Sequence, residues 1–164
     1  MQPEIRQIRD EDVESFYAAF SSVVFEHKYL AFLDPPPIEE TRAFIRNNIE
    51  KGYPQLVAIA DGDVVGWCDI IPPDRAVSAH VGILGIALMP DWRGNGLGER
   101  LMRAALGAAD AFGYLRVELS VFSHNTRAYK LYCKLGFSDE GAKVRGILLD
   151  GVFYDEIMMA RLKS

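Results

Sequence analysis

Cysteine is scarce in this sequence. Cys68 and Cys133 are the only two among 164 residues. They lie far apart and form neither a Cys-x-x-Cys motif nor a Cys/His pair at ligand spacing, so the sequence does not indicate a metal site. Free cysteines are often buried, and we expect both to pack as small apolar residues in the core. A nucleophilic role for Cys133 is the alternative, although no base lies beside it in its predicted helix.

Long apolar runs and an excess of basic charge are also missing. No stretch approaches the roughly 18 uncharged apolar residues of a membrane span, and residues 1–16 lack the apolar segment of a secretory signal. The 18 basic and 23 acidic residues give a net charge of −5, and the basic residues are scattered along the chain. We therefore expect a soluble, cytoplasmic protein that binds neither membranes nor nucleic acid.

The composition, 49% hydrophobic and 25% charged, is typical of one globular domain, which we predict over residues 1–164. Apolar periodicity predicts strands, helices and two hairpins that turn at Asp61-Gly62 and Asp150-Gly151. Their order is βααβββαβαββ, a mixed α/β chain with one βαβ crossover in the middle. The strand-like runs are 4–9, 55–71, 79–90, 114–122 and 143–162, and the helical ones 13–24, 39–52, 97–112 and 125–136.

A glycine-rich loop precedes the third predicted helix, with the sequence RGNGLGER from Arg93 to Arg100. A Walker loop would need Lys and then Ser or Thr after the last glycine, and the Rossmann spacing G-x-G-x-x-G is not met. What remains is an anion site made of free backbone N–H groups at a helix N-terminus, where glycines allow a phosphate to come close. A flexible turn that only begins a helix is the alternative interpretation.

Two motifs resemble the GNAT superfamily of acyl-CoA-dependent N-acyltransferases. The first runs from Arg93 through Gly94, Asn95, Gly96 and Leu97 to Gly98 and matches the pyrophosphate loop (Q/R)-x-x-G-x-(G/A). The second, N-x-x-A-x-x-L-Y-x-x-x-G-F over residues 125–137, is similar to the family's acyl-CoA and catalytic helix. The element order is also similar to that of the family. The stretch LGIALMPDWRGNGLG together with the C-terminal DGVFYDEIMMAR most resembles the bacterial branch that acetylates amino acids, small amines or protein N-termini. The resemblance implies a central twisted sheet of about seven strands flanked by about four helices.

The resemblance also implies how acetyl-CoA, the expected cosubstrate, is bound, with no metal required. Its pantetheine arm would pair with backbone groups of Ile86, Ala87 and Leu88 like an added strand, in a V-shaped opening between this strand and the one that ends near Val121. Residues 93–98 would hold the pyrophosphate. Gly85 would mark a bulge whose free N–H faces the thioester oxygen.

Tyr132 holds the family's position for the general acid that protonates the leaving thiolate, a task that suits a phenol with a pKa of about 10. Its alternative role is packing, since it shares an apolar helical stripe with Ala128 and Leu135. Asn125 likewise has two possible roles, a hydrogen bond to the cofactor arm or the N-cap of the helix.

Two residues are candidates for the general base. His80 is on the strand before the loop, and Glu118 shares a strand face with Ser120. A structural polar pair is the alternative for either residue. Some branches of the family place an acidic residue two positions after this histidine. Gly82 stands there instead, so a water relay is a further option.

For the acceptor amine, we expect a wall formed by the irregular segment 26–37 and the last hairpin, with Glu26, Tyr29 and Tyr154 as binding residues. The carboxylates of Glu26 and Asp34 would attract an ammonium group. The expected activity is direct transfer of an acetyl group from acetyl-CoA to a primary amine, an amino acid or a peptide N-terminus. Family habit alone suggests a homodimer. The alternatives are a catalytically silent acyl-CoA-binding module and a protein that binds ATP or NAD through the glycine loop.

Overall fold

The computed structural model describes residues 2–164, and Met1, the first residue of the predicted domain, lies outside this range. The element order confirms βααβββαβαββ. The helices are α1 (Val13–Phe25), α2 (Ile38–Lys51), α3 (Leu97–Phe112) and α4 (Thr126–Lys134). The strands are β1 (Glu4–Gln7), β2 (Gln55–Ala60), β3 (Asp63–Ile71), β4 (Val81–Leu88), β5 (Arg116–Phe122), β6 (Ser138–Leu149) and β7 (Val152–Leu162).

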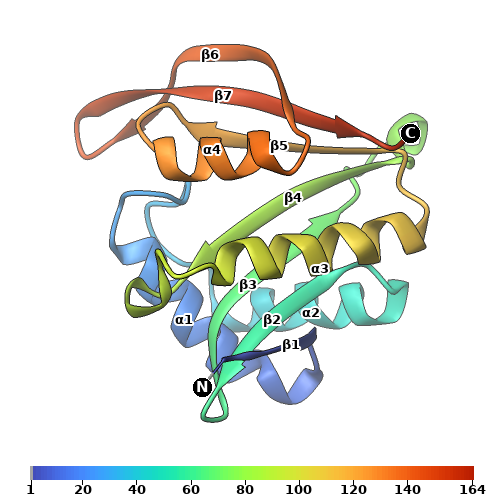
Figure 1. The fold of residues 1–164 in the computed structure, drawn as a ribbon. Coiled ribbons are helices and arrows are strands. Elements are labelled where there is room, and N and C mark those ends of the chain that lie inside the picture. The colour runs from blue at the N-terminus through green and yellow to red at the C-terminus, as the bar shows by residue number, and fades with distance from the viewer. Residues whose placement is uncertain (1) are drawn as a thin grey trace.

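All seven strands form one sheet in the order β1-β2-β3-β4-β5-β7-β6 (Figure 1). Neighbouring strands are antiparallel except β4 and β5, which α3 connects as a crossover. Both predicted hairpins are confirmed. Asp61 and Gly62 have φ angles of 51° and 83°, and Asp150 and Gly151 have 51° and 77°, the positive values that a tight hairpin turn needs.

Helices cover both faces of the sheet, α3 and α4 on one face and α1 and α2 on the other (Figure 1). Alternate residues of a strand point to opposite faces. On β3, Cys68 and Ile70 therefore pack with α3, while Trp67 packs against Phe16 of α1 with ring centroids 5.2 Å apart. No helix in residues 2–164 has the length and apolarity needed to cross a bilayer.

The sheet opens in its middle, between β4 and β5. These strands pair only from Val81 to Ile83 and from Arg116 to Glu118. Beyond that point β4 stays paired with β3 as far as Leu88, while β5 pairs with β7 along its whole length. The two halves of the sheet thus diverge, and the facing backbone edges of β4 and β5 lose their strand partner.

The bulge expected near Gly85 is not present. The β3–β4 pairing keeps one register from Ile71 and Ile83 to Gly66 and Leu88, and Met89 N donates to Val65 O at 2.9 Å just beyond it. In an antiparallel ladder hydrogen-bonded residues alternate, so the N–H of Gly85 points toward β3. The backbone groups that face the opening belong to Leu84, Ile86 and Leu88.

Only one cysteine meets the sequence expectation. Cys68 is fully buried on β3, and burial raises the pKa of its thiol well above its usual value. Cys133 is exposed, because it follows Tyr132 on α4 and the helix turns it away from the core that Tyr132 enters.

Candidate active site

The opening between β4 and β5 contains a cavity of about 190 Å³. Residues from five separate parts of the chain line it: the α1–α2 loop, β4, β5, α4 with its N-cap, and β7. They are Tyr29, Leu30, Ala31, Leu84, Gly85, Ile86, Leu119, Ser120, Val121, Phe122, Asn125, Tyr132 and Glu156. The strand divergence therefore forms a pocket that both faces of the sheet contribute to.

The edge of β4 offers backbone groups to this pocket. Leu84 and Ile86 line the cavity and present unpaired N–H and C=O groups to it, as the alternation along the strand requires. Of the residues expected to pair with pantetheine, Ala87 instead turns its backbone toward β3, where it pairs with Trp67. The Leu88 carbonyl accepts a hydrogen bond from Arg93 Nε at 2.9 Å.

The glycine loop has the conformation of an anion site. Gly94 and Gly96 have φ angles of 80° and 90°, which side chains disfavour, and Gly96 is the N-cap of α3. No side chain caps this helix, so the N–H groups of its first turn are available. A Cβ built on Gly96 would meet no atom within 4 Å, so the backbone here is open to a ligand.

Arg93 is committed to the protein itself. Its Nη1 and Nη2 donate to Glu26 Oε1 and Oε2 at 2.9 and 2.6 Å, and its guanidinium carbon lies 4.9 Å from the Tyr29 ring centroid. The hydrogen bonds hold the pKa of Glu26 below its usual value. Glu26 was expected to attract an ammonium group, but its charge is already neutralised by this bidentate pair. The pair joins the glycine loop to the α1–α2 loop.

Arg127 is the cation at the glycine loop that the sequence interpretation missed. A Cβ built on Gly94 would lie 3.4 Å from Arg127 Nη1. Within residues 2–164, this guanidinium makes no hydrogen bond or ion pair of its own. The sequence does contain a clue to this role. Arg127 follows the N-cap Asn125 by two residues, which places it in the first turn of α4, next to the glycine loop.

Asn125 and Tyr132 both line the cavity. Asn125 Oδ1 accepts a hydrogen bond from Ala128 N at 3.3 Å, so it caps α4, and its Nδ2 is left for a second partner. Tyr132 is 7% exposed, packs 6.1 Å from the Phe137 ring, and burial raises the pKa of its phenol. Its hydroxyl has no hydrogen-bond partner among the described residues. Both roles foreseen for Tyr132, core packing and a position in the site, are compatible in this geometry.

The structure brings neither predicted base to the cavity. His80 is exposed and precedes β4, at the end where β4 and β5 are still paired, and its carbonyl accepts hydrogen bonds from Leu115 and Arg116. Glu118 accepts a hydrogen bond from Arg116 Nε at 3.0 Å, and Arg116 also pairs with Glu140. Glu118 thus belongs to a polar pair, which was the alternative considered for it.

Aromatic rings lie on the side of the cavity where the acceptor amine is expected. Tyr29 lies in the cavity wall and stacks on His124 with centroids 6.5 Å apart, and Tyr154 lies 4.8 Å from the same ring. Two of the three predicted acceptor residues, Tyr29 and Tyr154, are therefore brought together through His124, which the sequence interpretation missed. Asp34 is exposed and lies outside the cavity lining.

Glu156 is the carboxylate that lines the cavity. Its side chain is 14% exposed, accepts a hydrogen bond from Ser120 Oγ at 2.9 Å and has Lys143 Nζ at 3.9 Å. Its position could not be read from the sequence, because it depends on the pairing of β7 with β5, where Glu156 lies opposite Phe122.

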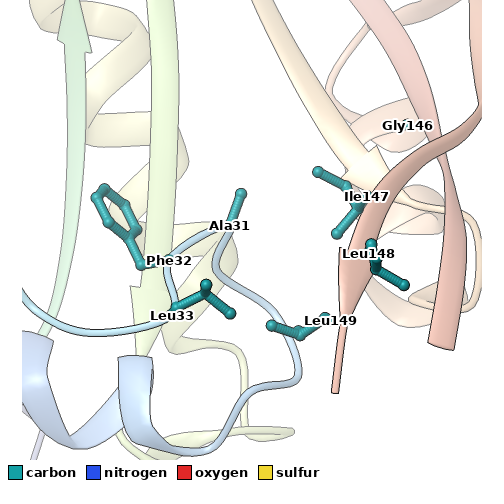
Figure 2. A pocket seen from close by; sticks show the side chains of 7 residues that line it. All are labelled: Ala31, Phe32, Leu33, Gly146, Ile147, Leu148 and Leu149. Carbon is teal, nitrogen blue, oxygen red and sulfur yellow. The ribbon is translucent and has the colours of Figure 1, made fainter. Parts of the chain in front are cut away.

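A second, apolar pocket of about 150 Å³ lies between the α1–α2 loop and β6 (Figure 2). Figure 2 shows Ala31, Phe32 and Leu33 on one side and Ile147, Leu148 and Leu149 on the other. Ala31 lines both pockets, so the two are adjacent. In the part of the chain that the structure describes, no group of three or more His, Cys, Asp or Glu residues could hold a metal ion.

Known proteins resemble this chain in sequence and in fold. It is 39% identical over 113 residues to the L-amino acid N-acetyltransferase AaaT of Escherichia coli, covering 68% of this chain and 70% of AaaT. The fold matches a ribosomal-protein-alanine N-acetyltransferase from Brucella melitensis with a TM-score of 0.91 and 20% identity, over 98% of this chain and 99% of the other. It also matches a phosphinothricin acetyltransferase from Sinorhizobium meliloti in complex with acetyl-CoA. The TM-score is 0.92 and the identity 22%, over 99% of this chain and 89% of the other.

The model of the acetyltransferase (GNAT) family matches residues 6–137. This stretch includes the glycine loop, the diverging strands and the helix that carries Tyr132, and thus most of the site described above. The chain belongs to the acetyltransferase (GNAT) family.

Proposed function

We propose that this protein transfers an acetyl group from acetyl-CoA to a primary amine by direct attack within a ternary complex. One observation carries the proposal: a single cavity contains the unpaired edge of β4, Asn125 and Tyr132, and extends to the acidic side chain of Glu156. A donor and an acceptor can therefore meet there without a covalent enzyme intermediate.

The donor side fits acetyl-CoA, which supplies the activated acetyl thioester. The edge of β4 at Leu84 and Ile86 would bind the pantetheine arm by backbone hydrogen bonds. The first-turn amides of α3, with Gly94, Gly96 and the guanidinium of Arg127, would bind the pyrophosphate. The acetyl-CoA complex of the S. meliloti relative supports the same choice of donor.

Tyr132 would act as general acid. Burial keeps its phenol protonated at neutral pH, and its hydroxyl is free to donate to the departing sulfur. The N–H groups of β4 that face the opening would stabilise the oxygen that gains charge during attack.

The acceptor side fits an α-amine with an apolar side chain. Glu156 would attract the ammonium group, and the neighbouring apolar pocket would take the side chain. An α-amine has a pKa of about 8, against about 10.4 for a lysine side chain, so it loses its proton more readily. The name of the E. coli relative, an L-amino acid N-acetyltransferase, and that of the B. melitensis enzyme, which concerns ribosomal-protein alanine, support free amino acids and peptide N-termini as candidates.

The test is release of free thiol from acetyl-CoA with a panel of amino acids, amino acid amides, N-terminal peptides, polyamines and aminoglycosides. We expect turnover that is highest for α-amines with apolar side chains. Tight binding of acetyl-CoA without turnover of any amine would contradict the proposal and favour a silent binding module. A rise in Tm with ATP or NAD but not with CoA would favour a nucleotide-binding protein, since a ligand of the folded state stabilises it.

We also propose a homodimer in the cytoplasm, on family habit alone. Light scattering coupled to size-exclusion chromatography measures the mass in solution, and cell fractionation measures the location. A monomeric mass would contradict the dimer and leave the proposed reaction unaffected.

A further inference from the structure

A carboxylate without a partner lies beside the cavity, on β3. Asp69 is opposite Gly85 in the β3–β4 ladder, and its neighbours Cys68 and Ile70 are both fully buried. Paired residues of two strands point to the same face of the sheet, so Asp69 faces the side of α1 and the acceptor wall. In residues 2–164, the carboxylate accepts no hydrogen bond and forms no ion pair.

Gly85 is next to both this carboxylate and the cavity. It lines the cavity, and a Cβ built on it would lie 3.3 Å from Asp69 Oδ1. Any side chain at this position would therefore cover the carboxylate. The glycine that the sequence interpretation associated with a bulge instead keeps a space open between Asp69 and the place where the acceptor amine is expected.

Among residues 2–164, no cation pairs with Asp69, and its neighbours on this face of the sheet are neutral. Gln55 lies opposite Asp69 on β2 and is buried. Its Oε1 accepts a hydrogen bond from Asn48 Nδ2, and its Nε2 has no hydrogen-bond partner among the described residues. On the same face, α1 contributes the rings of Phe16 and Phe20 around Trp67. Asp69 itself is half-buried. Desolvation raises the pKa of its carboxyl from 3.8 to about 7, and the nearby thiol of Cys68 is itself neutral. An acid without a partner costs stability when it is desolvated, and such groups are typical of functional sites.

We propose that Asp69 is the general base of the acetyl transfer, reached by the acceptor amine across Gly85. This inference rests on the proposed function. It assigns the general base to Asp69, whereas the sequence had offered His80 and Glu118 as candidates. Glu156, on the other side of the opening, has a hydrogen-bond partner in Ser120 and attracts the ammonium group.

With Asp69 as base and Tyr132 as acid, the reaction releases one proton in total. The acceptor ammonium gives one proton to the Asp69 carboxylate, and the neutral amine attacks the thioester carbon. When the C–S bond breaks, the thiolate takes the proton of Tyr132. The new amide nitrogen then loses its surplus proton, which restores the Tyr132 phenol through water, and Asp69 releases its proton to solvent. The net products are the N-acetyl amine, the free thiol and one proton.

The experiment compares pH profiles of kcat/KM for Asp69→Asn, Glu156→Gln and wild type, with an amino acid amide as acceptor. We expect Asp69→Asn to lower kcat/KM about 100-fold or more at neutral pH and to remove the acidic limb that the wild type shows near pH 7. Glu156→Gln should raise the KM of the amine and keep that limb. The affinity for acetyl-CoA, measured by calorimetry, should be the same in all three proteins.

Two further variants keep the test specific. Asp63→Asn makes the same chemical change at the exposed start of β3 and should behave as wild type. Gly85→Ala covers the carboxylate and should cost activity in the wild type but little in Asp69→Asn, since both changes remove the same route.

The outcomes separate the two levels of the proposal. If Asp69→Asn has the same kcat/KM and the same pH profile as the wild type, the assignment of Asp69 is wrong and the proposed function still stands. Loss of the acidic limb in Glu156→Gln but not in Asp69→Asn would also overturn the assignment of Asp69. Lack of thiol release from the wild type with every amine would overturn the proposed function and this assignment together.

Discussion

The two sides of the opening between β4 and β5 are built in different ways. On the proposed donor side, the groups that face the opening are mostly backbone amides, set by glycines at 94 and 96 and by the Asn125 cap. On the proposed acceptor side they are side chains from distant segments, such as Tyr29 and Glu156, with Asp69 beside the cavity. A cofactor that is the same throughout a family can be held by a local motif, whereas residues that only the tertiary fold assembles would recognise the acceptor.

Tyr132 lies where the two sides meet, and its removal should have the largest effect on catalysis. Tyr132→Phe keeps the ring against Phe137 and deletes the hydroxyl, so kcat should fall about 100-fold or more, with Tm and the KM of both substrates close to wild type. Steady-state kinetics of thiol release measure this. An unchanged kcat would show that another group protonates the thiolate.

Arg127 should separate the donor side from the acceptor side. Arg127→Ala removes the guanidinium beside Gly94, so we expect the KM for acetyl-CoA to rise about tenfold, as for the loss of a charge-assisted hydrogen bond. The KM of the amine should not change. Acetyl-pantetheine lacks the pyrophosphate and serves as the control donor, because the variant should use it as well as the wild type does. An equal loss with both donors would place Arg127 in a structural role.

The Arg93–Glu26 pair connects the two sides, so breaking it should affect both. Glu26→Gln leaves the guanidinium without its carboxylate and should destabilise the protein by about 1–3 kcal/mol, with a moderate rise in the KM of donor and acceptor alike. Thermal unfolding and kinetics measure the two effects. The matched control is Glu14→Gln, which breaks the exposed pair with Arg42 and should change little. A change in only one KM would show that the two loops are not coupled through this pair.

The smallest effect expected is a gain in stability on the acceptor side. The pKa of Asp69 is raised in the folded state, from 3.8 to about 7, so the carboxyl costs the fold stability as the pH rises from about 4 to about 7, and the full cost remains above pH 7. Asp69→Asn should therefore raise Tm by roughly 2–6 °C at pH 8. The gain should shrink as the pH falls from about 7 to about 4 and vanish below that, where both states bind the proton. A gain that is independent of pH would point to packing in place of charge.

The contrast between the two sides also explains what could be predicted from the sequence. Asp61-Gly62, Asp150-Gly151 and the Asn125 cap are local signals, and each has the predicted role in the structure. Two predictions were wrong because they depended on distant parts of the chain. Glu26 was expected to attract an ammonium group, but it pairs with Arg93, which is far along the chain. Gly85 was expected to mark a bulge, but its regular pairing with β3 leaves none. His124, Glu156 and Asp69 carry no local motif, and only strand pairing and loop packing reveal that they lie near the cavity.

The proposed donor binds along the edge of β4 that faces the opening, and amide-resolved hydrogen exchange with and without saturating acetyl-CoA measures this binding mode. We expect new protection at Leu84, Ile86 and Leu88 and in the first turn of α3. No change is expected at Gly85 and Ala87, whose amides already bond to β3. Saturating binding of acetyl-CoA that leaves exchange along β4 unchanged would show that the donor does not bind this edge.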